Sequence, residues 1–215
     1  MHTTGPAGEG VVTGTDLLVA VGRTPNTAGI GLELAGVERT EAGYLKVDEH
    51  LATTADRVWA MGECAGSPQF THAAFDDFRV VRSSLNGGTR STAGRLVPFC
   101  IFLDPELARV GRNESEARRD GIGYRLLTMP SAAILRTRTV SESRGFLKML
   151  VAADSDEILG FTAFGTEASE LMAAVQVAMI GHLPYTALGA GIFTHPTIAE
   201  GLVFLLSGSP ASPPP

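Results

Sequence analysis

The stretch HPTIAE, from His195 to Glu200, combines two side chains that can handle protons. An imidazole has a pKa near neutrality, so it can accept a proton from a reacting group and return it. A carboxylate bonded to the other ring nitrogen fixes the tautomer and stabilises the imidazolium. Pro196 is expected to pre-set a helix start, so that Glu200 lies in the first turn and can fold back on the ring. His195 and Glu200 are therefore a candidate acid–base pair, and a structural histidine is the competing interpretation.

The composition limits the classes of function. The chain has 215 residues and a net charge of -6, with 17 Lys and Arg against 23 Asp and Glu. It can bury one large core or two modest ones, so a globular protein is expected. The acidic balance offers no cationic face for a phosphate backbone, which argues against nucleic acid as a partner.

Targeting and membrane signals are weak. The first residues lack the basic and apolar regions of a secretory signal, so a cytoplasmic protein is expected. The run from Leu171 to Ala199 has no Asp, Glu, Lys or Arg. Because residues 181–184 (GHLP) interrupt it, the run predicts a buried helix followed by a turn, and not a membrane span.

The two cysteines do not form a recognisable motif. Cys64 and Cys100 lie 36 positions apart, which fits neither a C-x-x-C redox pair nor a zinc framework. Buried thiols are the favoured interpretation. A metal site assembled from His72, His182, His195 and these thiols is the weaker alternative, so no metal is predicted.

The first half of the chain has the pattern of an α/β domain. Residues 11–12 and 16–22 predict two strands, and the second, DLLVAVG, is apolar enough to be covered on both faces. Residues 58–61 predict another buried strand, which ends at Gly62. Helical spacing extends from Thr71 to Leu85, and the turn-rich segment 86–95 predicts a linker.

The second half has the pattern of an α+β domain. Five short strands at close spacing predict an antiparallel sheet: 97–103, 108–111, 124–130, 145–152 and 157–164. Helices are expected at 114–120, where Asn113 and Glu116 form a capping-box pattern, and at 166–180 and 196–206. The proline-rich residues after Ser207 are expected to be disordered.

Six of these segments occur in an order that resembles a known family. They are DLLVAVGRTPN (16–26), VWAMGEC (58–64), VPFCIFLDPELARVG (97–111), GFLK (145–148), ILG (158–160) and HPTIAE (195–200). Together they resemble the C-terminal half of the class I pyridine nucleotide-disulfide oxidoreductases, such as dihydrolipoamide dehydrogenase and mercuric reductase. The resemblance covers residues 11–206.

The resemblance implies a domain organisation and a fold. Residues 1–30 would end an NAD(P)-binding domain, and residues 31–95 would be the C-terminal return of an FAD-binding domain. Residues 96–207 would form the dimerisation domain, followed by a disordered tail at 208–215. The implied fold is an α+β dimerisation domain, an antiparallel sheet with helices, preceded by a partial α/β FAD/NAD(P)-binding domain. A homodimer is the implied assembly.

The resemblance also implies site residues. Gly62 and Glu63 occupy the place of a family A-x-G-D motif whose aspartate contacts the ribitol of FAD; a solvated turn glutamate is the alternative for Glu63. His72 and Ala73 match the stretch that passes the flavin ring, although His72 could be a helix N-terminal residue without a ligand. His195 would reach the flavin and disulfide of the other subunit, with Glu200 holding the imidazole.

Two family features are absent from the sequence. It contains no C-x-x-x-x-C pair and no G-x-G-x-x-G fingerprint that would place a pyrophosphate at a helix N-terminus. The chain alone is therefore expected to bind neither FAD nor NAD(P)H tightly and to be inactive. It would be the C-terminal portion of an FAD-dependent, NAD(P)H-linked disulfide oxidoreductase, either as a truncated reading frame or as a split enzyme completed by an N-terminal half on another chain. The alternative is a non-catalytic dimerisation or interaction module without flavin.

Overall fold

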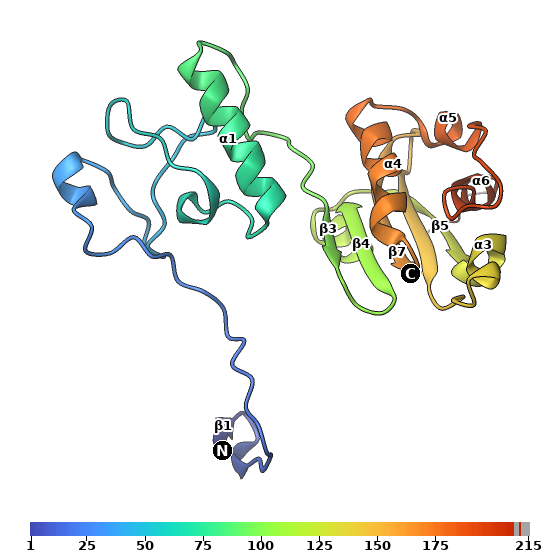
Figure 1. Cartoon of the computed structure of the whole chain (residues 1–215), viewed down its shortest axis with the longest axis horizontal. Helices are drawn as coiled ribbons and strands as arrows, with labels where there is room; N and C mark the ends of the chain where they lie inside the picture. Colours follow the sequence, from blue (N-terminus) through green and yellow to red (C-terminus); the bar gives the residue numbers. More distant parts are fainter. Residues whose placement is uncertain (209–210, 212–215) are drawn as a thin grey trace. The chain divides into compact units, whose positions relative to one another are not determined.

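The computed structural model describes residues 1–208 and 211, and it divides into two compact units, Met1–Thr92 and Ala93–Pro215 (Figure 1). Each unit is described by itself. Of the tail expected at 208–215, residues 209–210 and 212–215 lie outside the described part. Ala211 forms an antiparallel bridge with Leu126.

The first unit contains little regular structure. Strands β1 (His2–Gly5) and β2 (Gly8–Val11) pair as an antiparallel hairpin. Two short 3-10 helices follow, η1 (Leu32–Ala35) and η2 (Gly62–Ala65), and then helix α1 (Thr71–Leu85). The predicted helix at 71–85 is confirmed. Ala73, Asp77 and Val80 lie buried along one side of it, as the helical period requires.

Two strands predicted in this unit do not form. Residues 16–22 are extended but unpaired, and Leu17, Leu18, Val19 and Val21 are 67% to 90% exposed. Residues 58–61 make only an isolated bridge, between Ala52 and Trp59. The prediction of strands buried on both faces was wrong for the described chain, because such a strand needs neighbours for its backbone groups and layers over its side chains.

The second unit is built on a five-stranded antiparallel sheet of order β3-β4-β7-β6-β5. Its strands are β3 (Phe99–Ile101), β4 (Glu106–Gly111), β5 (Tyr124–Pro130), β6 (Phe146–Ala152) and β7 (Ile158–Gly165). All five predicted strands are confirmed, with β3 shorter than expected. The predicted α+β class of this half is therefore correct.

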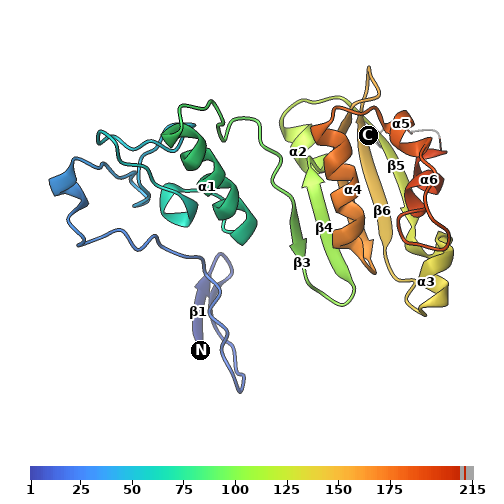
Figure 2. The same cartoon turned by 45° about the horizontal axis from the view of Figure 1, so that its top comes forward.

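The helices of this unit cover the sheet unequally. They are α2 (Glu114–Arg119), α3 (Leu135–Thr139), α4 (Ala168–Ile180), α5 (Tyr185–Gly189) and α6 (Gly201–Leu206), with a short 3-10 helix η3 (Ser131–Ala133) before α3. Helix α4 lies across β4 and β7 in both views (Figures 1 and 2). The predictions missed α3 and α5, and they placed the start of the last helix five residues too early.

The alternation of side chains along β6 shows how the two faces differ. Leu147, Met149 and Val151 point into the main core with α4 and α6, whereas Leu150 packs with Ala117 of α2 on the opposite face. Asn113 caps α2 through the predicted capping box, in which its side chain accepts from the Glu116 backbone N–H. Helix α2 therefore covers only one end of the second face.

Candidate active site

His195 and Glu200 meet in the loop that leads into α6. His195 Nδ1 lies 2.6 Å from Glu200 Oε2. The imidazole is 64% exposed, whereas the glutamate side chain is only 8% exposed. The predicted contact between the two side chains is present, with the carboxylate inside the fold and the ring at its surface.

The geometry defines which ring nitrogen can act as a base. An ionised carboxylate only accepts hydrogen bonds, so Nδ1 must carry the proton that it shares with Glu200. Nε2 of the neutral ring then has a free lone pair and can take a proton from an external group. The pair therefore has the arrangement of a general base with an orienting carboxylate.

The helix expected from Pro196 begins only at Gly201, so that part of the prediction was wrong. The His195–Pro196 peptide is cis, and residues 195–200 form a turn instead of a first helical turn. Thr197 Oγ1 donates to the Thr194 carbonyl at 2.6 Å and accepts from the Glu200 N–H at 3.3 Å. The Thr197 hydroxyl therefore links the backbone just before His195 to the backbone of Glu200.

The glutamate is anchored from the core. Ile198 and Leu202 on either side of it are buried. Glu200 Oε1 is buried and has no hydrogen-bond partner among the described residues. A buried, half-satisfied carboxylate costs stability, which favours a functional reason for its presence beside the histidine.

The other predicted site residues belong to the first unit. Glu63, in η2, forms a two-pronged ion pair with Arg23, whose Nη1 and Nη2 each lie 2.8 Å from one carboxylate oxygen. The N–H of Gly62 donates to Asp77 Oδ2 at 2.7 Å, and Gly62 adopts a positive φ of 74° that favours glycine. Asp77 is fully buried, so it fixes the turn that carries Glu63.

His72 and Ala73 lie at the start of α1. The imidazole of His72 stacks on Phe70 with 5.2 Å between ring centroids, and Ala73 is buried. These residues and Gly62 share the α1 and η2 region of the first unit, whereas His195 and Glu200 lie in the second.

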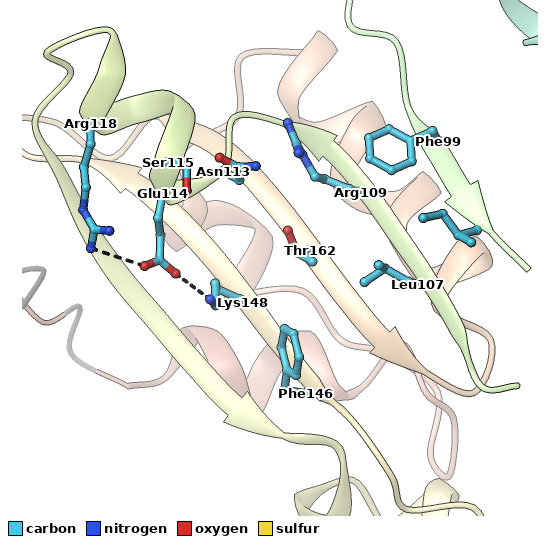
Figure 3. Close-up of a pocket in the computed structure, with 11 residues that line it drawn as sticks. Phe99, Leu107, Arg109, Asn113, Glu114, Ser115, Arg118, Phe146, Lys148 and Thr162 are labelled. Carbon is cyan, nitrogen blue, oxygen red and sulfur yellow. Dashed lines mark hydrogen bonds and ion pairs between the residues drawn. The ribbon is translucent and has the colours of Figure 1, made fainter. Parts of the chain in front are cut away.

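A pocket of about 500 Å³ lies on the sheet face that α2 leaves open (Figure 3). Its charged side chains are already paired: Glu114 contacts both Lys148 and Arg118, and Arg109 pairs with Glu116. The Arg109 guanidinium lowers the pKa of Glu116. The Arg109–Glu116 and Lys148–Glu114 pairs fasten α2 to strands β4 and β6.

The two cysteines are not joined in a disulfide. Cys64 and Cys100 are both free and half-buried, so they are less buried than expected. Desolvation and the neighbouring Glu106 raise the pKa of the Cys100 thiol. Within residues 1–208 and 211, no three His, Cys, Asp or Glu side chains gather as metal ligands, and no helix has the length and apolarity to cross a bilayer.

Comparison with known sequences decides the family. Residues 97–205 match the dimerisation domain of the pyridine nucleotide-disulphide oxidoreductases, and residues 6–77 match the pyridine nucleotide-disulphide oxidoreductase domain. The chain belongs to the pyridine nucleotide-disulphide oxidoreductase family. The predicted family, and the predicted fold of a dimerisation domain after a partial nucleotide-binding domain, are confirmed.

Several relatives of this oxidoreductase chain are known. It is 42% identical over 193 residues to the probable pyridine nucleotide-disulfide oxidoreductase RclA of Escherichia coli, covering 89% of this chain and 44% of that protein. It is 34% identical to mitochondrial dihydrolipoyl dehydrogenase of Dictyostelium discoideum, covering 91% and 41%, and 32% identical to mercuric reductase of Shigella flexneri, covering 86% and 33%. A solved structure of RclA, described as an HOCl-induced flavoprotein disulfide reductase, superposes with a TM-score of 0.82 over 87% of this chain and 44% of that one. The chain thus spans less than half the length of these relatives.

The family depends on FAD and NAD(P)H, and the residues of this chain at the expected flavin positions are Gly62, Glu63, His72 and Ala73. Arg23 engages both oxygens of Glu63, each of which keeps a further acceptor site for another donor. No glycine fingerprint supplies a pyrophosphate cradle.

Sequence reasoning missed three residues that shape these sites. Arg23 and Asp77 act on residues 40 and 15 positions away, and no local pattern indicates such pairs. Thr197 could have been found, because a threonine hydroxyl commonly bonds backbone groups within a turn.

Proposed function

We propose that the chain is the C-terminal portion of an FAD-dependent, NAD(P)H-linked disulfide reductase, to which it supplies a dimer interface and the His195–Glu200 acid–base pair. The observation that carries the proposal is the 2.6 Å contact between an exposed imidazole and a buried carboxylate. The similarity to a protein described as a flavoprotein disulfide reductase supports the reaction class. A cytoplasmic location belongs to the same proposal.

His195 would handle the protons of a dithiol. A thiol must lose its proton to become a nucleophile, and Nε2 can accept that proton while Glu200 holds Nδ1. The resulting imidazolium is stabilised by the carboxylate 2.6 Å away and can later return the proton to the leaving thiolate. The chain has no C-x-x-x-x-C pair, so the thiols would belong to another polypeptide segment.

The surface of α4 supports a homodimer. A helix that is apolar all round is normally buried on every side. Helix α4 contains one charged residue, Glu170, yet Val177 and Ile180 are 68% and 61% exposed. These side chains would be covered by a second copy, in line with the dimerisation domain to which the segment belongs.

The exposed run from Leu17 to Val21 supports a missing N-terminal half. Four large aliphatic side chains on an unpaired extended segment are unfavourable in water. A neighbouring strand and covering helices would satisfy both the backbone and the side chains. We infer that an N-terminal half, carrying the cysteine pair and the glycine fingerprints, supplies them.

The proposal is tested by complementation. The chain is co-expressed with an N-terminal segment carrying both glycine fingerprints and a C-x-x-x-x-C pair, such as the part of RclA that precedes the matched region. A complex that retains flavin and reduces a disulfide with NAD(P)H is expected. His195→Gln should lower kcat by about 100-fold or more, because general acid–base catalysis typically contributes that much.

His182→Gln is the matched control, because His182 is an exposed histidine of the same unit outside the site. The alternative, a non-catalytic dimerisation module, predicts a dimer whose complexes are indifferent to His195. A flavin-loaded complex in which His195→Gln turns over as fast as the parent would overturn the proposed role.

A further inference from the structure

Two arginines of the second unit differ from their neighbours in having no partner. Arg136 and Arg138 of α3 make no ion pair, guanidinium hydrogen bond or cation–π contact with any residue that the structure describes. Arginines elsewhere in the unit do have acidic partners, in the pairs Arg109–Glu116, Arg112–Asp120, Arg118–Glu114, Arg119–Asp120, Arg125–Asp156 and Arg144–Glu142. The two positive charges of α3 are therefore uncompensated.

The same helix adjoins the candidate active site. Ile134, the residue before α3, packs so closely on Gly201 that a Cβ there would lie 2.4 Å from Ile134 Cδ1. Gly201 follows Glu200 directly. In both views α3 lies beside the segment that leads into α6, which carries His195 (Figures 1 and 2).

Buried contacts hold the backbone of α3, which carries the two arginines. Thr137, between them, is fully buried, and its Oγ1 donates to the carbonyls of Ile134 at 2.8 Å and Ser131 at 3.0 Å. Arg136 is half-buried and Arg138 is exposed. The backbone of α3 is thus held in place while both guanidinium groups remain available.

The surroundings contain little negative charge. Residues 181–199, which include the loop with His195, have no Asp or Glu, and residues 131–141 have none either. Glu142, whose N–H donates to the Thr137 carbonyl, is ion-paired with Arg144. Glu200 is buried and bonded to His195. The acidic side chains Glu142 and Glu200 are therefore engaged by Arg144 and His195, whereas Arg136 and Arg138 have no acidic partner among the described residues.

We propose that Arg136 and Arg138 are specificity residues that select a disulfide substrate bearing carboxylates close to its S–S bond. A guanidinium binds a carboxylate through two parallel hydrogen bonds, and an arginine without a counterion gives up no existing pair to do so. The inference rests on the proposed function, because it takes His195 as the site of the reaction. It adds to the proposed function a preference for negatively charged substrates, which the His195–Glu200 pair does not determine.

The test compares two disulfides that differ in charge, the dianion 3,3′-dithiodipropionate and the neutral bis(2-hydroxyethyl) disulfide. Each is titrated into the isotopically labelled full chain, and the ring signals of His195 and the Nε–H signals of the arginines are followed by NMR. The dianion should shift the signals of His195, Arg136 and Arg138 and bind tighter than the neutral compound. Added salt should weaken its binding, because partly exposed charges are screened.

The variants Arg136→Gln and Arg138→Gln should each weaken binding of the dianion, and together by about tenfold or more, as expected for losing a charge-assisted hydrogen bond. Binding of the neutral disulfide should not change. Arg119→Gln, on α2, is the control, and Arg136→Lys should retain part of the affinity. Equal affinity for the two disulfides, or unchanged binding of the dianion by the folded double variant, would overturn the inference. The readout needs no turnover, so failure of the complementation experiment and failure of this one are distinguishable.

Discussion

Asp77 Oδ2 accepts a hydrogen bond of 2.7 Å from the backbone N–H of Gly62, fifteen residues earlier in the chain. The carboxyl group is fully buried, and Gly62 has the positive φ that opens η2. A side chain of α1 thereby fixes the turn on which Glu63 stands. This unit has a single α-helix and, apart from the β1–β2 hairpin, no sheet.

Replacing Asp77 by Asn should therefore destabilise the first unit. The substitution keeps the size of the side chain but loses a charge-assisted bond, and about 1–3 kcal/mol of unfolding free energy is expected to be lost. Urea denaturation followed by a probe in the first unit, such as the fluorescence of Trp59, measures it. Asp16→Asn, at an exposed position, should change stability by less than about 0.5 kcal/mol. Equal stability of the two variants would contradict the role of Asp77.

The sequence predicted the second unit better than the first, for a physical reason. The strands β5, β6 and β7 and the cap at Asn113 depend on local patterns: alternation of apolar residues and a side chain bonding three residues ahead. Residues 16–22 have the pattern of a buried strand, but strand formation also needs partners that the described chain does not contain. The periodicity of apolar residues indicates which secondary structure a segment can form. Whether it forms depends on the neighbouring segments that pair with it and cover it.

The candidate site was predictable in its residue types and not in its geometry. The contact between His195 and Glu200 follows from a motif, whereas the turn between them is held by Thr197, whose hydroxyl both donates and accepts a hydrogen bond. The engagement of Glu63 by Arg23 spans 40 positions and depends on the tertiary fold. The unpaired state of the α3 arginines likewise emerges only when their neighbours are known.

A second prediction concerns acid stability. The Arg144 guanidinium lowers the pKa of Glu142 from 4.5 to about 2. A carboxyl group whose pKa is depressed in the folded state contributes stability above its unfolded pKa and loses it as the pH falls from about 4.5 to about 2. Arg144→Gln should remove this contribution, so the urea midpoints of variant and parent should differ near neutral pH and converge on acidification.

The control for acid stability is Arg57→Gln, which removes an exposed arginine paired only with its neighbour Asp56. Its difference from the parent should not depend on pH in the same window. A constant gap between Arg144→Gln and the parent across that range would show that Glu142 is not the titrating partner.

A third prediction concerns assembly. Val177→Glu and Ile180→Glu place a charge where α4 is proposed to meet a second copy. An unpaired carboxylate in an apolar interface carries a large desolvation cost, so dimer dissociation constants should rise by at least about 100-fold. Sedimentation velocity on the full chain measures this. Leu85→Glu, at an equally exposed leucine of α1, should leave the dimer intact.

The last prediction tests how the loop from His195 to Glu200 is held against the core. Gly201 has no room for a side chain, because an added Cβ would lie 2.4 Å from Ile134 Cδ1, 2.9 Å from Ile134 Cγ1 and 3.4 Å from Leu147 Cδ1. Ile134 is 1% exposed, so a change of its rotamer would have to displace other core side chains. Gly201→Ala should lower the unfolding free energy by about 1–3 kcal/mol through overpacking, despite the higher helix propensity of alanine.

Shortening the opposing side chain separates this clash from other effects of the substitution. Ile134→Val removes the Cδ1 atom and alone should cost about 0.5–1.5 kcal/mol. In the Gly201→Ala background the same change should cost less or restore stability, which gives a favourable coupling energy in a double-mutant cycle. Strictly additive effects would mean that α6 can move off the core. In that case the buried position of Glu200 beneath His195 would not be set by this contact.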